Sequence, residues 1–336
     1  MNRDNFFSES NYIFLPTMKS PKVALAVDNR GVADNAFKLY TPFSHKAKLL
    51  KKVSEFYFSN FNGLSKIICG TKKEKKSFFI SYLEKKLDRQ LISSLYFSTA
   101  NDKVVMQLQT SNAEIVGYLK YPLNEVGLKH LINEIKAIKL LSEKNVVQSY
   151  LLHDEFDGMP FLLLSALDGE IGFVQRGYID DILLLFKRNY VYKLIDHPRI
   201  IQLQKLVVKN SFKNFSLIID RICENSKIEY ALVYEHGDFT PWNIIEVDGK
   251  YIPFDFEYFV EDGIEYFDLL KYNYQVGKLL EGRTGTELIK YLQKKIDIPE
   301  VLELFQLFLI KEIVQGYKEG ESFDVELEIL EYLDRL

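Results

Sequence analysis

Apolar and polar positions alternate in short runs through the second quarter of the chain. Runs rich in β-forming residues, separated by turn residues, predict five strands at residues 91–97, 103–109, 114–120, 147–154 and 160–165. Between the third and fourth runs, residues 125–144 carry apolar side chains at helical spacing. This order predicts a small antiparallel sheet of five strands with one helix.

After Asp168-Gly169 the spacing is mainly helical. Six segments have helical apolar spacing: residues 178–196, 198–225, 266–280, 286–295, 299–319 and 324–336. One hairpin interrupts them, with strands at residues 243–247 and 250–254 on either side of Asp248-Gly249, a dipeptide typical of tight hairpin turns. The pattern therefore predicts an α+β protein in which a sheet-rich part precedes a mostly helical part.

The first ninety residues follow neither pattern. Pro and Gly break residues 1–43 into short strands and loops, and helices are expected at residues 45–61 and 72–87. The second helix begins with KKEKK, which we expect to be a solvated helix end, with contact to an anionic membrane surface or substrate as the alternative. We place an N-terminal extension at residues 1–90, a first lobe at 91–165 and a second lobe at 166–336.

Composition narrows the class of protein. The net charge of −4 argues against a nucleic-acid partner, which would require a strongly basic domain. Cys69 and Cys223 are too far apart for a CxxC unit, which argues against a zinc site and favours a reducing, cytoplasmic location. No signal peptide and no transmembrane run of eighteen apolar residues is expected. Peripheral membrane contact stays open, and nothing in the pattern specifies an oligomeric state.

The candidate chemistry lies in and before the hairpin. Asp238 precedes Asn243 by five residues, and Asp255 ends the return strand. Strand pairing predicts that Asn243 and Asp255 meet at one mouth of the hairpin, with Asp238 just outside it. Oxygen ligands suit Mg²⁺, which also binds substrate phosphates. The spacing matches a phosphoryl-transfer template in which the first Asp is the catalytic base, while the Asn and the later Asp hold metal.

The strings HGDFTPWNI and IPFDFEY resemble the motifs of the aminoglycoside phosphotransferase/choline kinase-like family, and the resemblance spans residues 91–317. It implies a two-lobed, protein-kinase-like fold that uses ATP (or GTP) and Mg²⁺. It also implies that Lys120 binds nucleotide phosphates and pairs with Glu134. The loop after the first strand has no Gly, so Ser98 is the candidate phosphate contact there. Asp268 resembles a family Asp with a mainly structural role.

The resulting hypothesis is an ATP- and Mg²⁺-dependent small-molecule kinase that phosphorylates a hydroxyl group. A saccharide or lipid-linked saccharide of cell-envelope synthesis is the leading acceptor. Choline- or aminoglycoside-type acceptors are the alternative, since Glu257, Glu261, Asp262 and Glu265 could attract a cation. A non-catalytic kinase-like binding module is a further alternative. A protein kinase ranks last, because only residues 257–267 separate the metal triplet from the next helix.

Overall fold

The computed structural model describes residues 3–39, 51–53, 55–56, 71–98, 102–144, 146–317 and 322–335. The chain forms two compact units. The first comprises Met1–Ile135 and Gln148–Leu167, and the second comprises Lys136–Val147 and Asp168–Leu336. Within the described residues, no helix is long and apolar enough to cross a membrane.

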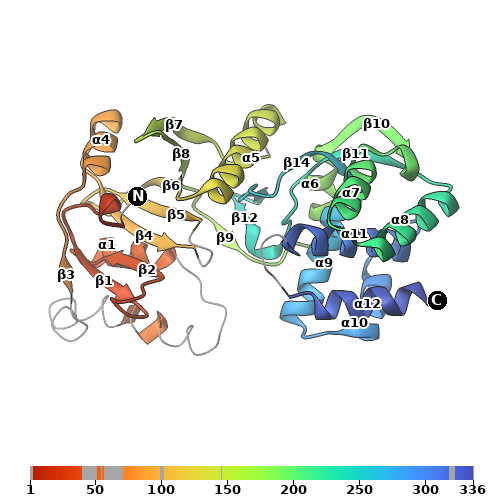
Figure 1. Ribbon diagram of the computed structural model, residues 1–336. Coiled ribbons are helices and arrows are strands. Elements are labelled where there is room, and N and C mark those ends of the chain that lie inside the picture. The colour runs from red at the N-terminus through yellow and green to blue at the C-terminus, as the bar shows by residue number, and fades with distance from the viewer. Residues whose placement is uncertain are drawn as a thin grey trace. The chain divides into compact units, whose positions relative to one another are not determined.

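The first unit is built on an eight-stranded antiparallel sheet with the order β3-β1-β2-β4-β5-β6-β8-β7 (Figure 1). Its strands are β1 (Asn11–Leu15), β2 (Val23–Ala26), β3 (Lys72–Lys73), β4 (Ile92–Phe97), β5 (Lys103–Gln109), β6 (Ile115–Pro122), β7 (Tyr150–Phe156) and β8 (Met159–Ser165). The five predicted strands, β4 to β8, are confirmed. The helix predicted after the third strand is also confirmed as α5 (Glu125–Leu141).

Described parts of the first ninety residues extend this sheet. Strand β2 pairs with β4, so the N-terminal strands continue the predicted five. The helix predicted from residue 72 begins later, as α4 (Phe78–Leu87), because Ser77 caps it and the chain before it pairs with β1 as β3. A further short helix is α1 (Arg30–Ala36). Most of the helix predicted at residues 45–61 lies outside the described residues.

Lysines at both ends of the KKEKK run contact carboxylates. Lys72 lies 2.6 Å from Glu74, and Lys76 lies 2.8 Å from Glu84 on α4. These ion pairs are at the surface, where they contribute little to stability. They favour the expectation of a solvated charge run over that of a membrane contact.

A buried hydroxyl network joins the N-terminus to the sheet. The Tyr12 hydroxyl accepts from the Ser8 amide at 3.0 Å and lies 2.6 Å from the Ser8 Oγ and 3.0 Å from the Ser93 Oγ on β4. Tyr12 is fully buried, and burial raises its pKa to about 12. The first residues of the chain are therefore tied to the sheet by satisfied polar groups as well as by apolar packing.

The second unit contains seven α-helices among its described residues after Asp168: α6 (Arg176–Phe186), α7 (Pro198–Lys209), α8 (Lys213–Asn225), α9 (Phe267–Gln275), α10 (Gly285–Lys295), α11 (Val301–Gly316) and α12 (Asp324–Asp334). Two three-stranded sheets accompany them. One has the order β10 (Lys187–Lys193), β11 (Glu229–Glu235), β14 (Val260–Ile264), and the other β13 (Lys250–Pro253), β12 (Ile244–Val247), β9 (Glu170–Ile171). The predicted hairpin is confirmed as β12 and β13.

Two predicted helices require correction. The helix expected at residues 178–196 ends at Phe186, because residues 187–193 form β10 and pair with β11, about forty residues further along the chain. The helix expected at residues 198–225 divides into α7 and α8. Ser211 between them has a φ of +63°, which no helix accommodates. In the first case the apolar spacing did not predict the strand, because residues 187–193 form a strand only by pairing with the distant β11.

Helix α11 forms the centre of the second unit. Leu304 to Ile310 are all buried, so the helix is enclosed on every side rather than packed along one stripe. The next two residues, Lys311 and Glu312, carry their charges into this interior. Their partners, described below, connect the core with the candidate active site.

The hydroxyl network gives a stability prediction for the N-terminal segment. Replacing Tyr12 by Phe should lower the free energy of unfolding by about 1–3 kcal/mol, because buried groups of Ser8 and Ser93 lose a partner. Denaturant titration would measure this loss. Tyr332→Phe is the matched control. The Tyr332 side chain is exposed on α12, so this change should affect stability little. Equal stability of Tyr12→Phe and wild type would contradict an integral role for the segment.

Candidate active site

A buried carboxylate fixes the loop that follows β11. The backbone amides of His236 and Gly237 donate to the two oxygens of Asp268, at 2.7 and 3.0 Å. Asp268 lies in the first turn of α9, and it has the structural role that the sequence resemblance implied. Burial, followed by the nearby charge of Glu235, raises the pKa of Asp268 to about 7, although the two donated bonds oppose this rise.

Gly237 is required where the loop turns towards Asp238. Its φ is +83°, and a Cβ atom there would lie 2.3 Å from the carbonyl oxygen of Tyr258. Any larger residue would have to displace backbone rather than a flexible side chain. The path of the chain into Asp238 is therefore fixed by the bonds to Asp268 and by the close approach of Gly237 to Tyr258.

His236 connects this loop to the return strand of the hairpin. Its Nδ1 accepts from the Asp238 amide at 3.3 Å, and its Nε2 donates to the Phe254 carbonyl at 3.0 Å, which assigns the tautomer. The ring is fully buried, and burial lowers its pKa, so the imidazole is neutral at pH 7. Through these contacts His236 shapes the loop.

Asn243 holds the carboxylate of Asp238. Its amide nitrogen donates to the Asp238 carbonyl at 2.9 Å and to the Asp238 Oδ2 at 2.8 Å. Both amide hydrogens point to Asp238, which leaves the Asn243 Oδ1 as the atom that can face a cation. One side chain can thus contact the candidate base and a metal ion together.

The hairpin brings Asn243 and Asp255 to the same end. The amide of Phe254 donates to the Asn243 carbonyl at 3.0 Å, and Asp255 is the next residue. Asp255 has a φ of +66°, a conformation uncommon for residues other than Gly. Such backbone outliers gather at functional sites because the surrounding structure has to impose them.

The donors at this end fit Mg²⁺. Among the described residues, no three His, Cys, Asp or Glu side chains gather as a metal cluster. Proteins often bind Mg²⁺ with only one or two oxygen ligands of their own, and waters and substrate phosphates supply the rest. An amide oxygen and one carboxylate are such a pair of ligands. The assignment of Asn243 and Asp255 as metal ligands stays a prediction, and these residues are compatible with it.

The first unit contains the predicted ion pair. The Lys120 Nζ on β6 lies 2.7 Å from both carboxylate oxygens of Glu134 on α5. Both side chains are largely removed from solvent, at 12% and 2% exposure. Desolvating such a pair costs free energy that its mutual attraction barely recovers, which indicates a use other than stability. Binding of nucleotide phosphates by Lys120 remains a prediction.

Ser98 is engaged within its own loop. Its hydroxyl donates to the Asp102 carboxylate and accepts from the Asp102 amide at 3.1 Å. Burial raises the pKa of Asp102, but hydrogen bonds from His130 and Ser98 outweigh it and lower that pKa overall. Ser98 therefore shapes the end of β4, and its contact with phosphate stays a prediction.

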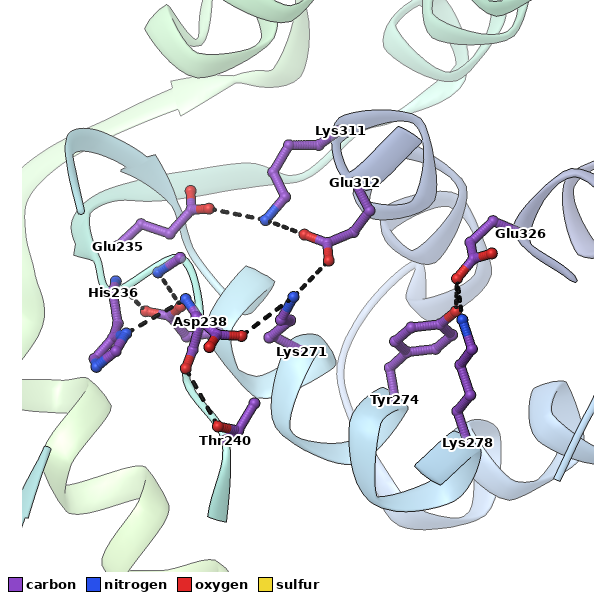
Figure 2. Close-up of polar contacts among 12 residues, drawn as sticks. Glu235, His236, Asp238, Thr240, Lys271, Tyr274, Lys278, Lys311, Glu312 and Glu326 are labelled. Carbon is purple, nitrogen blue, oxygen red and sulfur yellow. Dashed lines mark hydrogen bonds and ion pairs between the residues drawn. The ribbon is translucent and has the colours of Figure 1, made fainter. Parts of the chain in front are cut away.

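A line of buried charges that the sequence analysis missed ends at Asp238. The Lys271 Nζ on α9 lies 3.4 Å from the Asp238 Oδ1 and 2.6 Å from the Glu312 Oε2. Figure 2 shows the line continuing from Glu312 through Lys311 to Glu235, at 2.7 and 3.3 Å. Charges of opposite sign alternate along it, so each buried ion has a partner.

Lys271 and Glu312 are charged at neutral pH. Burial lowers the pKa of Lys271, but Glu312 and Asp238 outweigh that effect and raise it above its ordinary value. Burial raises the pKa of Glu312, but Lys271 and Lys311 outweigh it and lower the pKa to about 2. The Lys311-Glu312 dipeptide inside a mostly apolar helix was a signal for this cluster, since such residues are seldom buried unpaired.

A pocket of about 340 Å³ opens beside Asp238 in the second unit. We call it the Asp238 pocket. Its lining includes Asp238, Glu257, Lys271, Lys278, Glu312 and Glu326. The candidate base is therefore at the wall of a polar cavity large enough for a small molecule.

Comparisons with known proteins gave structural matches only. No family model and no curated protein sequence matches the chain. A choline kinase from Streptococcus pneumoniae is similar, with 14% identity, 77% of this chain and 98% of that chain covered, and a TM-score of 0.47. An ethanolamine kinase from Plasmodium vivax is also similar, with 13% identity, coverages of 91% and 94%, and a TM-score of 0.42.

A third similar structure is a thermostable mutant of an aminoglycoside phosphotransferase in complex with AMP-PNP and hygromycin B. It is 10% identical, the match covers 76% of this chain and 96% of that chain, and the TM-score is 0.48. Because these values are low, we derive the function from the chain's own residues.

The charge line gives a prediction about coupling. Lys271→Met should destabilise the protein by about 1–3 kcal/mol, because Asp238 and Glu312 each lose an ion-pair partner while Glu312 keeps Lys311. The double variant Lys271→Met/Glu312→Gln should be more stable than the sum of the single effects, by at least about 1 kcal/mol. Denaturant titration of the four proteins measures this coupling. Additive losses would show that Lys271 and Glu312 are not partners in solution.

Proposed function

We propose that this protein is an ATP- and Mg²⁺-dependent phosphotransferase acting on the hydroxyl group of a small molecule. The observation that carries the proposal is the double hydrogen bond from the Asn243 amide to Asp238. It fixes the candidate base and leaves the Asn243 Oδ1 as the atom that can bind a cation, and Asp255 lies at the same end of the hairpin. A catalytic base and an oxygen donor set for Mg²⁺ are thereby built into one short segment.

Each residue has a definite task in this reaction. Asp238 orients the acceptor hydroxyl and takes its proton as the hydroxyl oxygen forms a bond to the γ-phosphorus. The bond from that phosphorus to the bridging oxygen breaks, which gives ADP and a phosphate ester. Lys120, oriented by Glu134, binds the phosphates of the nucleotide, and Asn243 and Asp255 hold the metal. Bound Mg²⁺ supplies neutralisation of the phosphate charge.

The acceptor that we propose is a saccharide, free or lipid-linked, from cell-envelope synthesis. A polar pocket beside Asp238 supports a saccharide. A lipid-linked saccharide would favour a protein that contacts the membrane surface. Lys72 and Lys76 of the KKEKK run are paired with carboxylates, so they give the lipid-linked form no separate support. A choline- or aminoglycoside-type acceptor is the second candidate, and Glu257 in the pocket lining is the observation that favours it. We further propose a cytoplasmic location and GTP as the alternative nucleotide.

Asp238→Asn should reduce turnover by about a hundredfold or more with little change in melting temperature, because the amide cannot take the hydroxyl proton. An ADP-release assay with the best acceptor measures turnover. Asp248→Asn in the exposed hairpin turn is the matched control: it has a φ of +51°, which Asn accommodates, and it should retain wild-type turnover. Turnover of Asp238→Asn near the wild-type value would refute the role of Asp238.

ATP with Mg²⁺, at about a hundred times its Kd for the folded state, should stabilise the wild-type protein by about 2.7 kcal/mol relative to the ligand-free protein, and ATP with a chelator should stabilise it less. Asp255→Asn should remove the Mg²⁺-dependent part, and Lys120→Met should weaken the response to nucleotide. Thermal melts with each addition measure these effects. A wild-type response that Mg²⁺ does not change would favour the non-catalytic module.

A further inference from the structure

The Asp238 pocket contains a second group of charged residues, separate from the line that ends at Asp238. Lys278 follows α9, Glu326 lies on α12, and both line the pocket with Tyr274. The Lys278 Nζ lies 2.5 Å from the Glu326 Oε1, and the Tyr274 hydroxyl donates to the same oxygen. Figure 2 shows this group beside the pair formed by Lys271 and Glu312.

This second group comes from helices outside the catalytic loop. Glu326 is buried at 5% exposure, although it comes from a surface helix near the end of the chain. Burial, with the charge of Glu326 adding to it, raises the pKa of Tyr274, so its hydroxyl is a donor at neutral pH. A buried carboxylate that is held by two donors at a pocket wall is suited to accepting a further hydrogen bond from a ligand.

The chemistry of the lining matches hydroxyl groups. A hydroxyl both donates and accepts, and this wall provides ammonium donors from Lys271 and Lys278 beside carboxylate acceptors from Glu312 and Glu326. Gln275 and Gln315 add side-chain amides, which can also donate and accept hydrogen bonds. Hydrogen bonds to charged partners are the stronger ones, so neighbouring hydroxyls of a polyol would be bound well.

The same wall is poorly suited to a quaternary ammonium group. Such a cation binds over the faces of aromatic rings. The Lys278 ammonium already lies over the Tyr274 ring, 5.4 Å from its centroid. Tyr258 and Phe323 are the other aromatic residues in the described lining, and two rings form only part of an aromatic cage. The lining has four carboxylates and two ammonium groups, but Asp238, Glu312 and Glu326 are each paired with a lysine, and a second cation beside Lys278 would meet charge repulsion.

We propose that the acceptor is an uncharged polyhydroxylated molecule, a carbohydrate or polyol, whose non-reacting hydroxyls are bound by Lys278 and Glu326 while its reacting hydroxyl faces Asp238. This inference rests on the phosphotransferase function proposed above. It makes Lys278 and Glu326 specificity-determining residues, and it excludes acceptors whose recognition depends on a cationic nitrogen.

The first test compares acceptors that differ by one group. ADP release with ATP and Mg²⁺ would be measured for glucose against glucosamine, galactose against galactosamine, and for choline, ethanolamine and kanamycin. The uncharged sugars should have kcat/KM values at least about tenfold above those of their amino counterparts, since the ammonium would face Lys278. A preference for choline, ethanolamine, kanamycin or the amino sugars would overturn the proposal.

The second test uses variants of the second charged group. Glu326→Gln and Lys278→Met should each raise KM for the best sugar by about tenfold and change kcat little, since they bind groups remote from the reacting atoms. The double variant Lys278→Met/Glu326→Gln leaves no unpaired buried charge, which protects against misfolding. An unchanged KM in a folded double variant would refute the specificity role.

Failure of the inference can be told from failure of the proposed function. Saturation-transfer NMR of the same sugars with the wild-type protein, without nucleotide, measures binding directly. Loss of the Mg²⁺-dependent thermal response with sugar binding intact would remove the phosphotransferase and leave the carbohydrate site. Nucleotide response with no binding of any uncharged sugar at about fifty millimolar would overturn the carbohydrate proposal alone.

Discussion

The two hydrogen bonds that Asp268 accepts from consecutive loop amides determine where the candidate catalytic residues lie. Asp238 follows those amides by one residue, and Asn243 then takes its position from Asp238. Because both oxygens of Asp268 are occupied by backbone donors, a shift of α9 would move the whole loop. The buried carboxylate of Asp268 connects the helical core to the loop before the hairpin. The proposed chemistry depends on the geometry of these two hydrogen bonds.

The charges of Lys271, Lys311 and Glu312 are costly to bury, so their arrangement requires a reason other than stability. Apolar residues at Lys311 and Glu312 would pack into the surrounding core of α11 without a desolvation penalty. The alternating line instead carries an ammonium, that of Lys271, to within 3.4 Å of the Asp238 carboxylate. With Asn243 on the other oxygen, both sides of that carboxylate are contacted, and its orientation is fixed before any substrate arrives.

Local pattern predicted the elements whose partners are near in sequence. Strands β4 to β8 and the hairpin of β12 and β13 are joined mainly by short turns, so alternation and turn residues were sufficient. Strand β10 resembled the end of a helix because its pairing with β11 spans about forty residues, which no window of apolar spacing contains. The N-terminal strands were likewise recognised as strands, but their place beside β4 depends on pairing over about seventy residues.

The same reasoning explains which part of the candidate site could be predicted. Asp238, Asn243 and Asp255 lie within eighteen residues, and their spacing matches the phosphoryl-transfer template, so a short window of sequence was sufficient to find them. Lys271, Glu312 and Glu326 come from three helices and meet only through tertiary packing. A short motif can encode what every reaction of this kind requires. The groups that would distinguish one acceptor from another are dispersed along the chain, so they become visible only in the folded structure.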